Sequence, residues 1–313
     1  MIPIPEQPKT LDAYHACMLC PRRCGVDRFA CTGICGAGDV LRIGRASLHW
    51  WEEPCLVGDR GSGAVFFAHC ALGCVYCQNK RLAEGEGVEV TQERLSEILL
   101  KLQNEQRAAN INLVTASHYA PSVASVLREL RSSGALHIPV VWNTSGYENA
   151  QTLALLEGLI DIYLVDFKYS NPATARRLSH ASDYVEVALA ALEQMMEQTG
   201  VPCLDEEGYL ERGVIVRHLV LPGYVDDSLA ALDLLYPRIK GRALLSIMNQ
   251  FTIVDEALDV RAYGLERAVS DEEYERVLDH ADELGFEDYF WQEGGAASES
   301  FVPAFDGTGV LVS

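Results

Sequence analysis

Short apolar runs alternate with stretches of helical periodicity through most of the chain beyond residue 60. The runs that predict strands cover residues 64–67, 111–114, 138–142, 161–167, 214–221 and 243–248. Each run is apolar at consecutive positions rather than at every second one, which indicates burial on both faces, as in a parallel sheet. The pattern therefore predicts six short buried strands.

The segments between these runs carry apolar residues at the spacing of an α-helix. In the first segment, Leu95, Ile98, Leu99 and Leu102 fall at i, i+3, i+4 and i+7, and Thr91 precedes them as an N-cap. Further helices are predicted around residues 123–130, with Gly134 ending that helix, and at 148–157, 172–179, 184–199 and 227–235. Alternating strands and helices indicate parallel βα units. Six units are too few for a closed eight-stranded barrel, so a partial barrel and a doubly wound sheet remain as alternatives.

The first 60 residues follow a different pattern. They are rich in cysteine and turn residues and carry no sustained periodicity. No Gly-, Ser- or Pro-rich linker divides the remainder of the chain. We therefore predict an α/β fold in two parts, in which residues 1–60 form a small Cys-rich metal-binding segment and residues 61–313 form the βα core with a C-terminal extension.

Composition narrows the class of partner. The chain has 313 residues, 49% of them hydrophobic, and a formal net charge of −20, which argues against nucleic acid and anionic membranes as partners. No stretch approaches the roughly 18 consecutive apolar residues of a membrane span, and the N-terminus lacks the apolar core of a signal peptide. We expect a cytoplasmic protein, in which the ten cysteines are better explained as metal ligands than as disulfides.

Polar side chains follow each of the six predicted strands. In parallel α/β folds ligands bind at the carboxyl ends of the strands, so these side chains are expected to share one site. They are Cys70, Cys74 and Cys77; Thr115 to Tyr119; Asn143 to Tyr147; Asp166 and Lys168; Arg217 and His218; and Asn249 and Gln250.

The loop after the first strand carries Cys70, Cys74 and Cys77 at the spacing C-x3-C-x2-C. Three thiolates can hold three corners of a [4Fe–4S] cluster and leave one iron for a chelating ligand such as the amino-acid end of S-adenosylmethionine. One electron from such a cluster would cleave the sulfonium and give a 5′-deoxyadenosyl radical. The alternative from spacing alone is a zinc site completed by His69 or Cys55.

The motif C-x3-C-x-aromatic-C, with Tyr76 as the aromatic residue, resembles the radical S-adenosylmethionine (radical SAM) superfamily. That resemblance implies a partial (βα)6 barrel and a Tyr76 backbone near the adenine of the cofactor. Seven blocks further resemble the pyruvate formate-lyase activating enzyme-like group: CMLCPRRCGVDR, SLHWWEEPC, GSGAVFFAHCALGCVYCQN, NINLVTASHYAPS, WNTSGYE, DIYLVDFKYS and RHLVLPG.

The resemblance assigns roles to two further strand ends. Asp166 and Lys168 match an Asp-x-Lys motif that contacts the methionyl end of the cofactor, although a structural ion pair is the alternative. Arg217 and His218 open an element that lines the nucleoside. His218 is expected either to contact the ribose or adenine or to be an ordinary buried histidine.

Two other positions depart from the family pattern. The Gly-Gly-Glu that receives the cofactor amino group in the superfamily is absent, and Ser117 with His118 is predicted to take its place. Asn143 and Thr144 fall where activating enzymes place an acid and a threonine around a monovalent cation, but Asn143 carries no charge.

A second group of cysteines, C-x2-C-x3-C-x10-C, lies near the N-terminus and is predicted to bind a second metal. Zinc and an auxiliary iron–sulfur cluster both fit four thiolates. The predicted ligands are Cys17, Cys20, Cys24 and Cys35, with Cys31 as an extra residue. Between the two groups, Glu52 and Glu53 either form a salt bridge at the rim of the fold or face the substrate opening.

These features predict a radical enzyme that abstracts hydrogen from a substrate. The resemblance to activating enzymes implies that this hydrogen comes from a backbone glycine of a glycyl-radical enzyme, and that flavodoxin or ferredoxin donates the electron. A small-molecule substrate is the alternative within the enzymes. A non-catalytic electron carrier or metal scaffold is the alternative from another class.

Overall fold

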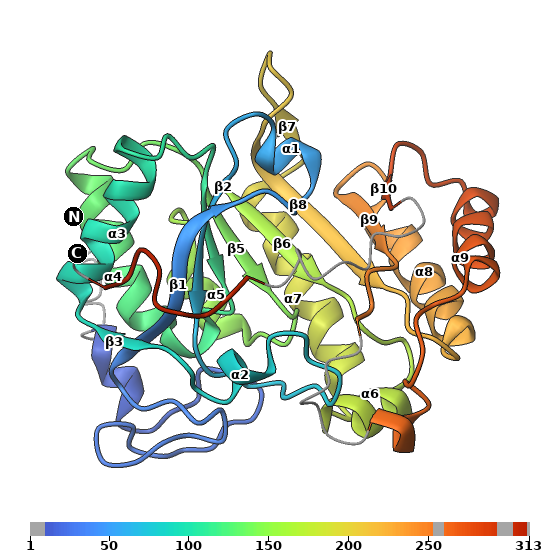
Figure 1. Ribbon diagram of the computed structural model, residues 1–313, viewed down its shortest axis with the longest axis horizontal. Helices are drawn as coiled ribbons and strands as arrows, with labels where there is room; N and C mark the ends of the chain where they lie inside the picture. Colours follow the sequence, from blue (N-terminus) through green and yellow to red (C-terminus); the bar gives the residue numbers. More distant parts are fainter. Residues whose placement is uncertain (1–9, 253–259, 293–302, 312–313) are drawn as a thin grey trace, which may run out of the picture.

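One ten-stranded sheet organises the chain (Figure 1). The computed structural model describes residues 10–252, 260–292 and 303–311. The strand order is β10-β9-β8-β6-β5-β4-β2-β1-β3, and β7 pairs with β8. The strands are β1 (Leu41–His49), β2 (Ser62–Phe67), β3 (Val88–Val90), β4 (Ile111–Val114), β5 (Val140–Thr144), β6 (Ile162–Asp166), β7 (Cys203–Leu204), β8 (Leu210–Leu219), β9 (Leu244–Met248) and β10 (Phe290–Trp291).

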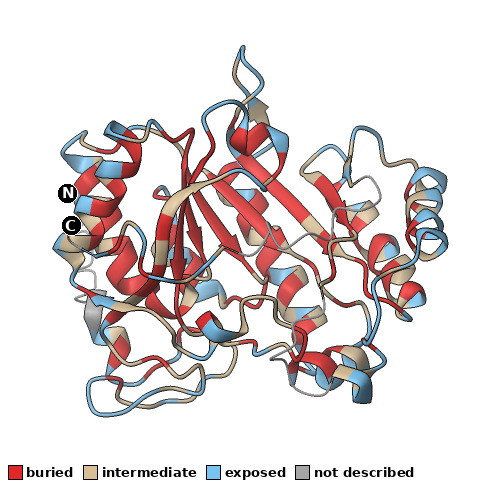
Figure 2. Ribbon diagram, viewed as in Figure 1, coloured by how far each residue is buried: buried red, intermediate tan, exposed pale blue. Residues whose placement is uncertain are grey.

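The six predicted strands are confirmed as β2, β4, β5, β6, β8 and β9. Each is parallel to its neighbour in this sequence, and every residue of β2, β4 and β5 is buried (Figure 2). β5 ends later than the predicted residue 142 because its pairing with β6 continues to Thr144, opposite Val165. The strands follow one direction across the sheet, without the reversal that defines a doubly wound fold. The architecture is therefore the partial barrel.

The helices form a layer that follows the strands. Neighbours in this layer contact each other in chain order, α3 with α4, α4 with α5, and α5 with α7, while α8 contacts α9. No helix in the described ranges combines the length and the apolar composition needed to cross a membrane. The helices are α1 (Pro54–Val57), α2 (Lys80–Ala83), α3 (Gln92–Asn104), α4 (Ala120–Ser132), α5 (Ala150–Leu156), α6 (Pro172–Ser179), α7 (Tyr184–Thr199), α8 (Val225–Ile239) and α9 (Asp271–Leu284), with 3₁₀ turns η1 (Thr10–Tyr14), η2 (Ser117–Tyr119) and η3 (Val260–Tyr263).

The predicted helices are confirmed, although the ends of several of them differ from the prediction by a few residues. α6 and α7 occupy the predicted residues, and the Thr91 hydroxyl accepts a hydrogen bond from the backbone N–H of Arg94 at 3.2 Å, as an N-cap does. The apolar residues that repeat at helical spacing on α3 are the residues that face the core. Neighbouring residues in the sequence were therefore enough to predict this helix.

Strand β1 is an element that the sequence pattern did not predict. It lies within the first 60 residues and runs antiparallel to β2, and β3 runs antiparallel to β1. The C-terminal residues 303–311 lie along its other side, where Ala46 N–H donates to the Thr308 carbonyl at 2.9 Å and Gly307 N–H donates to the Gly44 carbonyl at 2.9 Å (Figure 1). Segments from both ends of the chain therefore build this edge of the sheet, and the predicted boundary at residue 60 stays a prediction.

Candidate active site

A cavity of about 210 Å³ opens at the inner side of the sheet, where the parallel strands end. All six predicted strands contribute to its wall, so the structure brings together residues as far apart in the sequence as His49 and Gln250. We call it the first cavity. Its lining includes Cys70, Tyr76, Cys77, Thr115, Asn143, Thr144, Ser145, Asp166, Lys168, Arg217, Met248 and Gln250, with His49, Trp51 and Glu52 from the segment after β1.

The three-cysteine loop, residues 70–77, is fixed by a chain of hydroxyl groups. Ser179 at the end of α6 donates to the sulfur of Cys74 at 3.0 Å. Because that proton goes to sulfur, Tyr169 donates to Ser179, and Tyr76 donates to Tyr169 at 2.8 Å. Tyr76 therefore lines the first cavity while its hydroxyl is anchored in the core. The loop is built to hold its sulfur atoms in place.

Burial and neighbouring charges act on two thiols of this loop, Cys74 and Cys77. Burial raises the pKa of Cys74 and raises that of Cys77 to about 12, and the neighbouring thiolates raise both further. Lys168 acts in the opposite direction on each. A bound metal group would add to the effect of Lys168 and favour the thiolate forms of these two cysteines.

The two candidate fourth ligands of the zinc alternative lie in other surroundings. In the part of the chain that the structure describes, no group of three or more His, Cys, Asp or Glu side chains is arranged to hold a metal ion, and this holds for the three-cysteine loop as well, so the geometry by itself does not distinguish zinc from iron. Cys55, one of the two candidate fourth ligands, lies in α1 and packs with Leu56 and Val141 in a separate hydrophobic cluster. His69 precedes the loop in a left-handed conformation, with φ 74°, and its ring lies beside Gly36 and Gly85.

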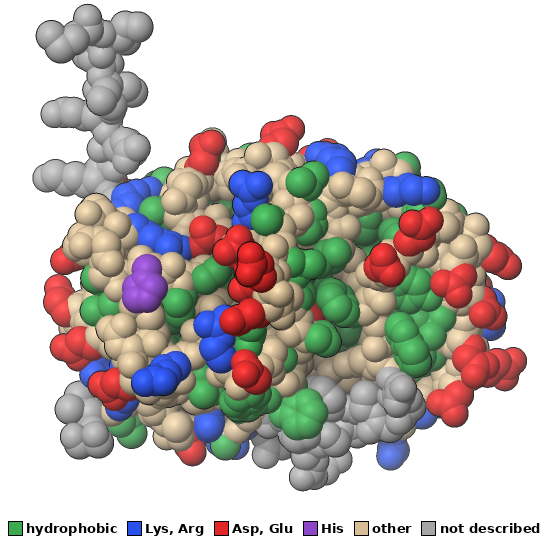
Figure 3. All heavy atoms as spheres, turned by 90° about the horizontal axis from the view of Figure 1, so that it is seen from above, with side chains coloured by type: hydrophobic (Ala, Val, Ile, Leu, Met, Phe, Trp, Pro, Cys, Tyr) green, Lys and Arg blue, Asp and Glu red, His purple; other side chains and the backbone are tan. Residues whose placement is uncertain are grey.

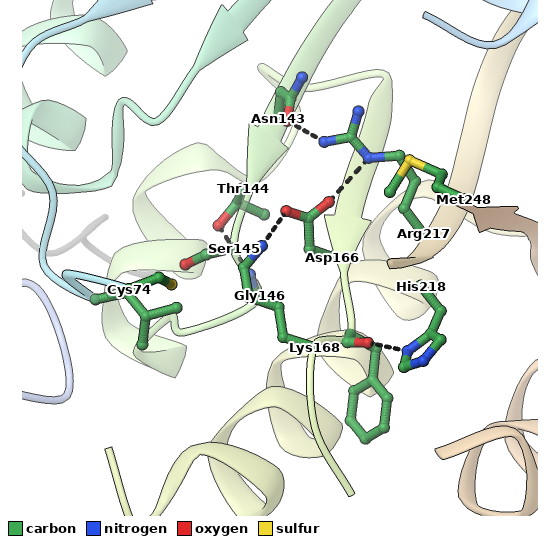
Figure 4. Close-up of polar contacts among 12 residues, drawn as sticks. Cys74, Asn143, Thr144, Ser145, Gly146, Asp166, Lys168, Arg217, His218 and Met248 are labelled. Atoms are coloured by element: carbon green, nitrogen blue, oxygen red, sulfur yellow. Dashed lines mark hydrogen bonds and ion pairs between the residues drawn. The ribbon is translucent and has the colours of Figure 1, made fainter. Parts of the chain in front are cut away.

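A network of charged groups forms the floor of the first cavity (Figure 4). The carboxylate of Asp166 accepts from Lys168 Nζ at 2.7 Å and from Arg217 Nε at 2.9 Å. Arg217 also donates to the side chain of Asn143 at 2.8 Å. Burial acts to raise the pKa of Asp166, but the charges of Arg217 and Lys168 outweigh it and hold the carboxyl below its usual range. Asp166 is therefore ionised and positions both cations.

Glu52 completes this network from the segment after β1. Its carboxylate accepts from Arg217 Nη1 at 2.9 Å and from the side chains of Asn112 at 2.9 Å and Asn143 at 3.2 Å. Only 7% of its side chain is exposed, so the ion pair is buried. Both predicted alternatives were partly right, because Glu52 makes a salt bridge and also lines the first cavity. The ion pair of Glu52 and Arg217 lies inside the fold, however, and not at its rim.

Ser117, His118 and His218 are not among the residues that line the first cavity. The Ser117 hydroxyl donates to Glu148, and His118 Nε2 donates to the Ala68 carbonyl at 2.8 Å. His218 is 1% exposed and donates from Nδ1 to the Phe167 carbonyl at 2.7 Å (Figure 4). The geometry favours the buried-core reading of His218, and the cofactor contacts predicted for Ser117 and His118 stay predictions without geometric support.

Glu148 is a buried carboxylate that the sequence analysis passed over. It accepts from Thr144 Oγ1 at 2.6 Å and from Trp142 Nε1 at 3.2 Å in addition to Ser117. Burial raises its pKa, and these donors act against that rise. Glu148 thereby fixes the end of β5, where Asn143 and Thr144 face the first cavity. The signal for it was its place in the block WNTSGYE, which carries a single acid.

Tyr184 at the start of α7 joins two strand ends. Its hydroxyl lies 2.8 Å from both the Ser145 and the Asp166 carbonyl oxygens and accepts from the Lys168 backbone N–H at 2.9 Å. Gly146 lies beside it with φ 77°, and a Cβ there would come within 2.7 Å of the Asp166 carbonyl oxygen. The register of Asp166 and Lys168 thus depends on residues that the strand pattern alone could not identify.

The predicted N-terminal ligands are neighbours in pairs but are not arranged as a group of three or more in the described residues, and Cys31 is exposed. The sulfur atoms of Cys24 and Cys35 both lie 3.4 Å from the position that a Cβ on Gly33 would occupy. Burial raises the pKa of Cys20 to about 12, with the charges of Cys35 and Cys17 adding to the rise. Burial also acts to raise the pKa of Cys24, but backbone hydrogen bonds from Ile34 and Val26 outweigh it. The second metal itself stays a prediction.

Two arginines dock this N-terminal segment onto the core. Arg22 donates to the carbonyl oxygens of Ala71 at 3.0 Å and Leu72 at 3.1 Å, inside the three-cysteine loop, and to those of Ser179 and His180 at the end of α6. Arg28 is 1% exposed and donates to the carbonyl oxygens of His118 and Gly38. Hydrogen bonds from Arg22 therefore connect the segment that carries the N-terminal cysteines with the three-cysteine loop.

Comparison with known proteins identifies the fold. The family model described as "Radical SAM superfamily" matches residues 65–235, more than half of the chain. An uncharacterized protein of Methanocaldococcus jannaschii is 26% identical over 282 residues, covering 88% of this chain and 76% of that protein. The crystal structure of SuiB from Streptococcus suis aligns with a TM-score of 0.50 and 12% identity over 72% of this chain. The chain spans about half of SuiB, 47% of its length, and this likeness shows the fold alone.

Proposed function

The chain belongs to the radical SAM superfamily, and on that premise we propose that it cleaves S-adenosylmethionine reductively and abstracts hydrogen from a substrate. Members of this superfamily are enzymes that use a [4Fe–4S] cluster and S-adenosylmethionine. The observation that carries the proposal is that Cys70, Cys77, Asp166 and Lys168 line one cavity at the ends of the parallel strands.

We assign the cluster to Cys70, Cys74 and Cys77. When bound, the cluster supplies the electron that cleaves the sulfonium of S-adenosylmethionine into methionine and a 5′-deoxyadenosyl radical. The protein's part is to hold the thiolates, to position the cofactor and to keep the site dry. Ser179 holds the sulfur of Cys74, and the Tyr169 hydroxyl behind it keeps Ser179 oriented.

We assign the amino-acid end of S-adenosylmethionine to the pair Asp166 and Lys168. A lysine ammonium has three donors, and Asp166 accepts one of them, so Lys168 can also donate to the cofactor carboxylate. Burial acts to lower the pKa of Lys168, but the charge of Asp166 outweighs it and keeps the ammonium protonated. Arg217 donates to Asp166 of this pair, and it also donates to Glu52 and Asn143.

For the finer reaction we propose activation of a glycyl-radical enzyme, with hydrogen taken from a backbone glycine. The support is the resemblance of seven sequence blocks to the pyruvate formate-lyase activating enzyme-like group. Co-purification from anaerobically grown cells tests it, because a glycyl-radical enzyme should be retained with the tagged protein. Finding none, while flavodoxin or ferredoxin still reduces the protein, would exclude the activating role.

Abstraction of hydrogen from a small molecule is the second candidate. A second cavity of about 160 Å³ adjoins the first, and five residues line both: Trp51, Glu52, Arg217, Met248 and Gln250. A walled cavity next to the radical source suits a compact substrate group better than an open face would.

Anaerobic incubation with dithionite and S-adenosylmethionine tests the shared chemistry. We expect release of 5′-deoxyadenosine and methionine from the wild-type protein, and none from Cys74→Ala. Cys203→Ala, which changes a cysteine outside both groups, should retain the release. An inert mixture from protein that carries its iron would exclude the enzyme and favour the electron carrier.

A further inference from the structure

The second cavity lies against the first, with the ion pair of Arg217 and Glu52 as their common wall. Viewed from above, this side of the molecule shows hydrophobic side chains gathered around a hollow (Figure 3). The described lining of the second cavity comprises Trp50, Trp51, Glu52, Glu53, Pro54, Arg217, Ser246, Met248, Gln250, Phe290, Trp291 and Gln292.

Glu53 is the unusual member of this lining. Its side chain is buried, with 7% of the residue exposed, and Oε2 has no hydrogen-bond partner. A side-chain hydrogen bond with Ser246 satisfies the carboxylate only in part. A buried carboxylate with one unsatisfied oxygen favours taking up a proton or a cation. Burial raises the pKa of Glu53, in keeping with that preference.

The neighbouring arginine does not neutralise Glu53 by contact. Arg217 is the single Lys or Arg in the described lining, and its Nε, Nη1 and Nη2 donate to Asp166, Glu52 and Asn143 respectively. Arg217 thus makes its hydrogen bonds to other groups, although its charge still acts to lower the pKa of Glu53 against burial. Glu53 therefore lines a cavity whose one cation among the described residues is already hydrogen-bonded elsewhere.

The rest of the wall suits a cation with an apolar body. Three tryptophans line the cavity, and Trp50, Trp51 and Trp291 are 48%, 49% and 55% exposed. Indole faces attract ammonium groups, and their area packs against methylene chains. Phe290 and Met248 extend the apolar wall towards the first cavity. An anionic ligand would meet Glu52 and Glu53 and would be repelled.

We propose that the second cavity is a substrate subsite that binds an alkylammonium group, with Glu53 as its counter-ion and the tryptophans around its methylene chain. This inference rests on the proposed function, because it takes the first cavity to be the source of the radical. It specifies the substrate class: an amine, free or on a lysine-like side chain, whose carbon chain points past Arg217 towards the cofactor.

Binding of n-pentylammonium to the cluster-loaded protein tests the subsite without any turnover. Tryptophan fluorescence and saturation-transfer NMR report binding, with S-adenosylmethionine present and no reductant. We expect saturable binding of n-pentylammonium and at least tenfold weaker binding of pentan-1-ol and pentanoate. Glu53→Gln should weaken the binding of n-pentylammonium at least tenfold. Glu206→Gln, an exposed carboxylate on the β7–β8 turn, should leave it unchanged.

A second variant keeps the subsite testable if Glu53→Gln fails to fold. Trp291→Leu keeps apolar area and removes one indole face, so it should weaken n-pentylammonium about threefold and leave pentan-1-ol unchanged. Equal binding of the alcohol and the amine, or unchanged amine binding in Glu53→Gln, would overturn the subsite. Release of 5′-deoxyadenosine without amine binding would reject this inference alone, whereas amine binding without any release would reject the proposed function alone.

Discussion

Arg22 donates to the carbonyl oxygen of Leu72 at 3.1 Å and so connects the N-terminal cysteine segment with the three-cysteine loop. Arg22 lies between Cys20 and Cys24 in the sequence, and Leu72 lies between Cys70 and Cys74. The same guanidinium holds the end of α6, which supplies the hydroxyl bound to Cys74. Arg22 therefore contacts the backbone that carries the three-cysteine loop and the helix end that supports it.

Arg22→Ala should loosen the three-cysteine loop without unfolding the protein. A hydrogen bond from a charged donor contributes about 1.5–3 kcal/mol, so losing the set should cost the loop at least about 2 kcal/mol of stability. We expect faster loss of iron to a chelator and lower iron content, with little change in circular dichroism. Arg23→Ala, an exposed neighbour, is the control. Equal iron retention in the two variants would show that the connection has no role in holding the cluster.

Gly146→Ala should displace Asp166. Gly146 has φ 77°, and a Cβ would come within 2.7 Å of the Asp166 carbonyl oxygen. Gly158 has φ 72° with no atom near its Cβ position, so Gly158→Ala isolates the backbone cost, which is about 1 kcal/mol. We expect Gly146→Ala to lose roughly 3 kcal/mol of unfolding free energy and most of its affinity for S-adenosylmethionine. Identical effects of the two substitutions would contradict the role of this close approach.

Lys168→Met should separate cofactor binding from folding. Asp166 keeps its hydrogen bond to Arg217 at 2.9 Å and so stays paired, and the loss of unfolding free energy should stay below the roughly 3–5 kcal/mol of an uncompensated buried charge. Loss of the ammonium should weaken binding of S-adenosylmethionine at least tenfold, as measured by equilibrium dialysis on cluster-loaded protein without reductant. Lys101→Met on the exposed face of α3 is the matched control. Unchanged affinity would remove Lys168 from the cofactor site.

Glu273 predicts a specific dependence of stability on pH. Its carboxylate accepts from Arg267 at 2.7 Å, and from the backbone N–H groups of Gly223 at 2.8 Å and Ser270 at 3.0 Å. The hydrogen bond from Arg267 is the main cause that lowers its pKa from 4.5 to about 2. The unfolded chain therefore takes up a proton at a higher pH than the folded chain does. The stabilisation is complete above about pH 4.5 and is lost as the pH falls towards 2.

Urea unfolding of Glu273→Gln at several pH values measures this effect. The variant should be less stable than the wild type at pH 7, and the difference between them should shrink as the pH falls below 4.5. A difference that stays constant from pH 7 to pH 3 would show that the carboxylate charge is not what links α9 to the Pro-Gly turn after β8.

Metal analysis separates the two cysteine groups. Anaerobically purified protein should hold about four irons with zinc, or about eight irons without it. Cys74→Ala should remove the irons of the three-cysteine loop and leave the N-terminal metal in place. Cys31→Ala, at an exposed position, should leave both contents unchanged. Loss of both metals together from Cys74→Ala would contradict two separate sites.

Local patterns were enough to identify the six parallel strands and the principal helices. A buried strand is apolar along its length and a helix repeats within two turns, so both are recorded in neighbouring residues. β1 escaped detection because its burial alternates only in part and because residues 303–311, far along the chain, provide its cover. The C-x3-C-x2-C spacing was likewise a local signal, since one short loop carries all three thiols.

The sequence by itself determined the six parallel strands, to within a few residues at their ends, and the loop that carries the three thiols, because those features depend on residues close together in the chain. Only the tertiary structure decided that Glu52 pairs with Arg217, 165 residues away, that Ser117 turns to Glu148, and that Glu53 is buried beside a cavity. Whether a side chain is buried, and which charge it pairs with, depends on residues from distant segments of the chain. Those segments come together only when the chain folds.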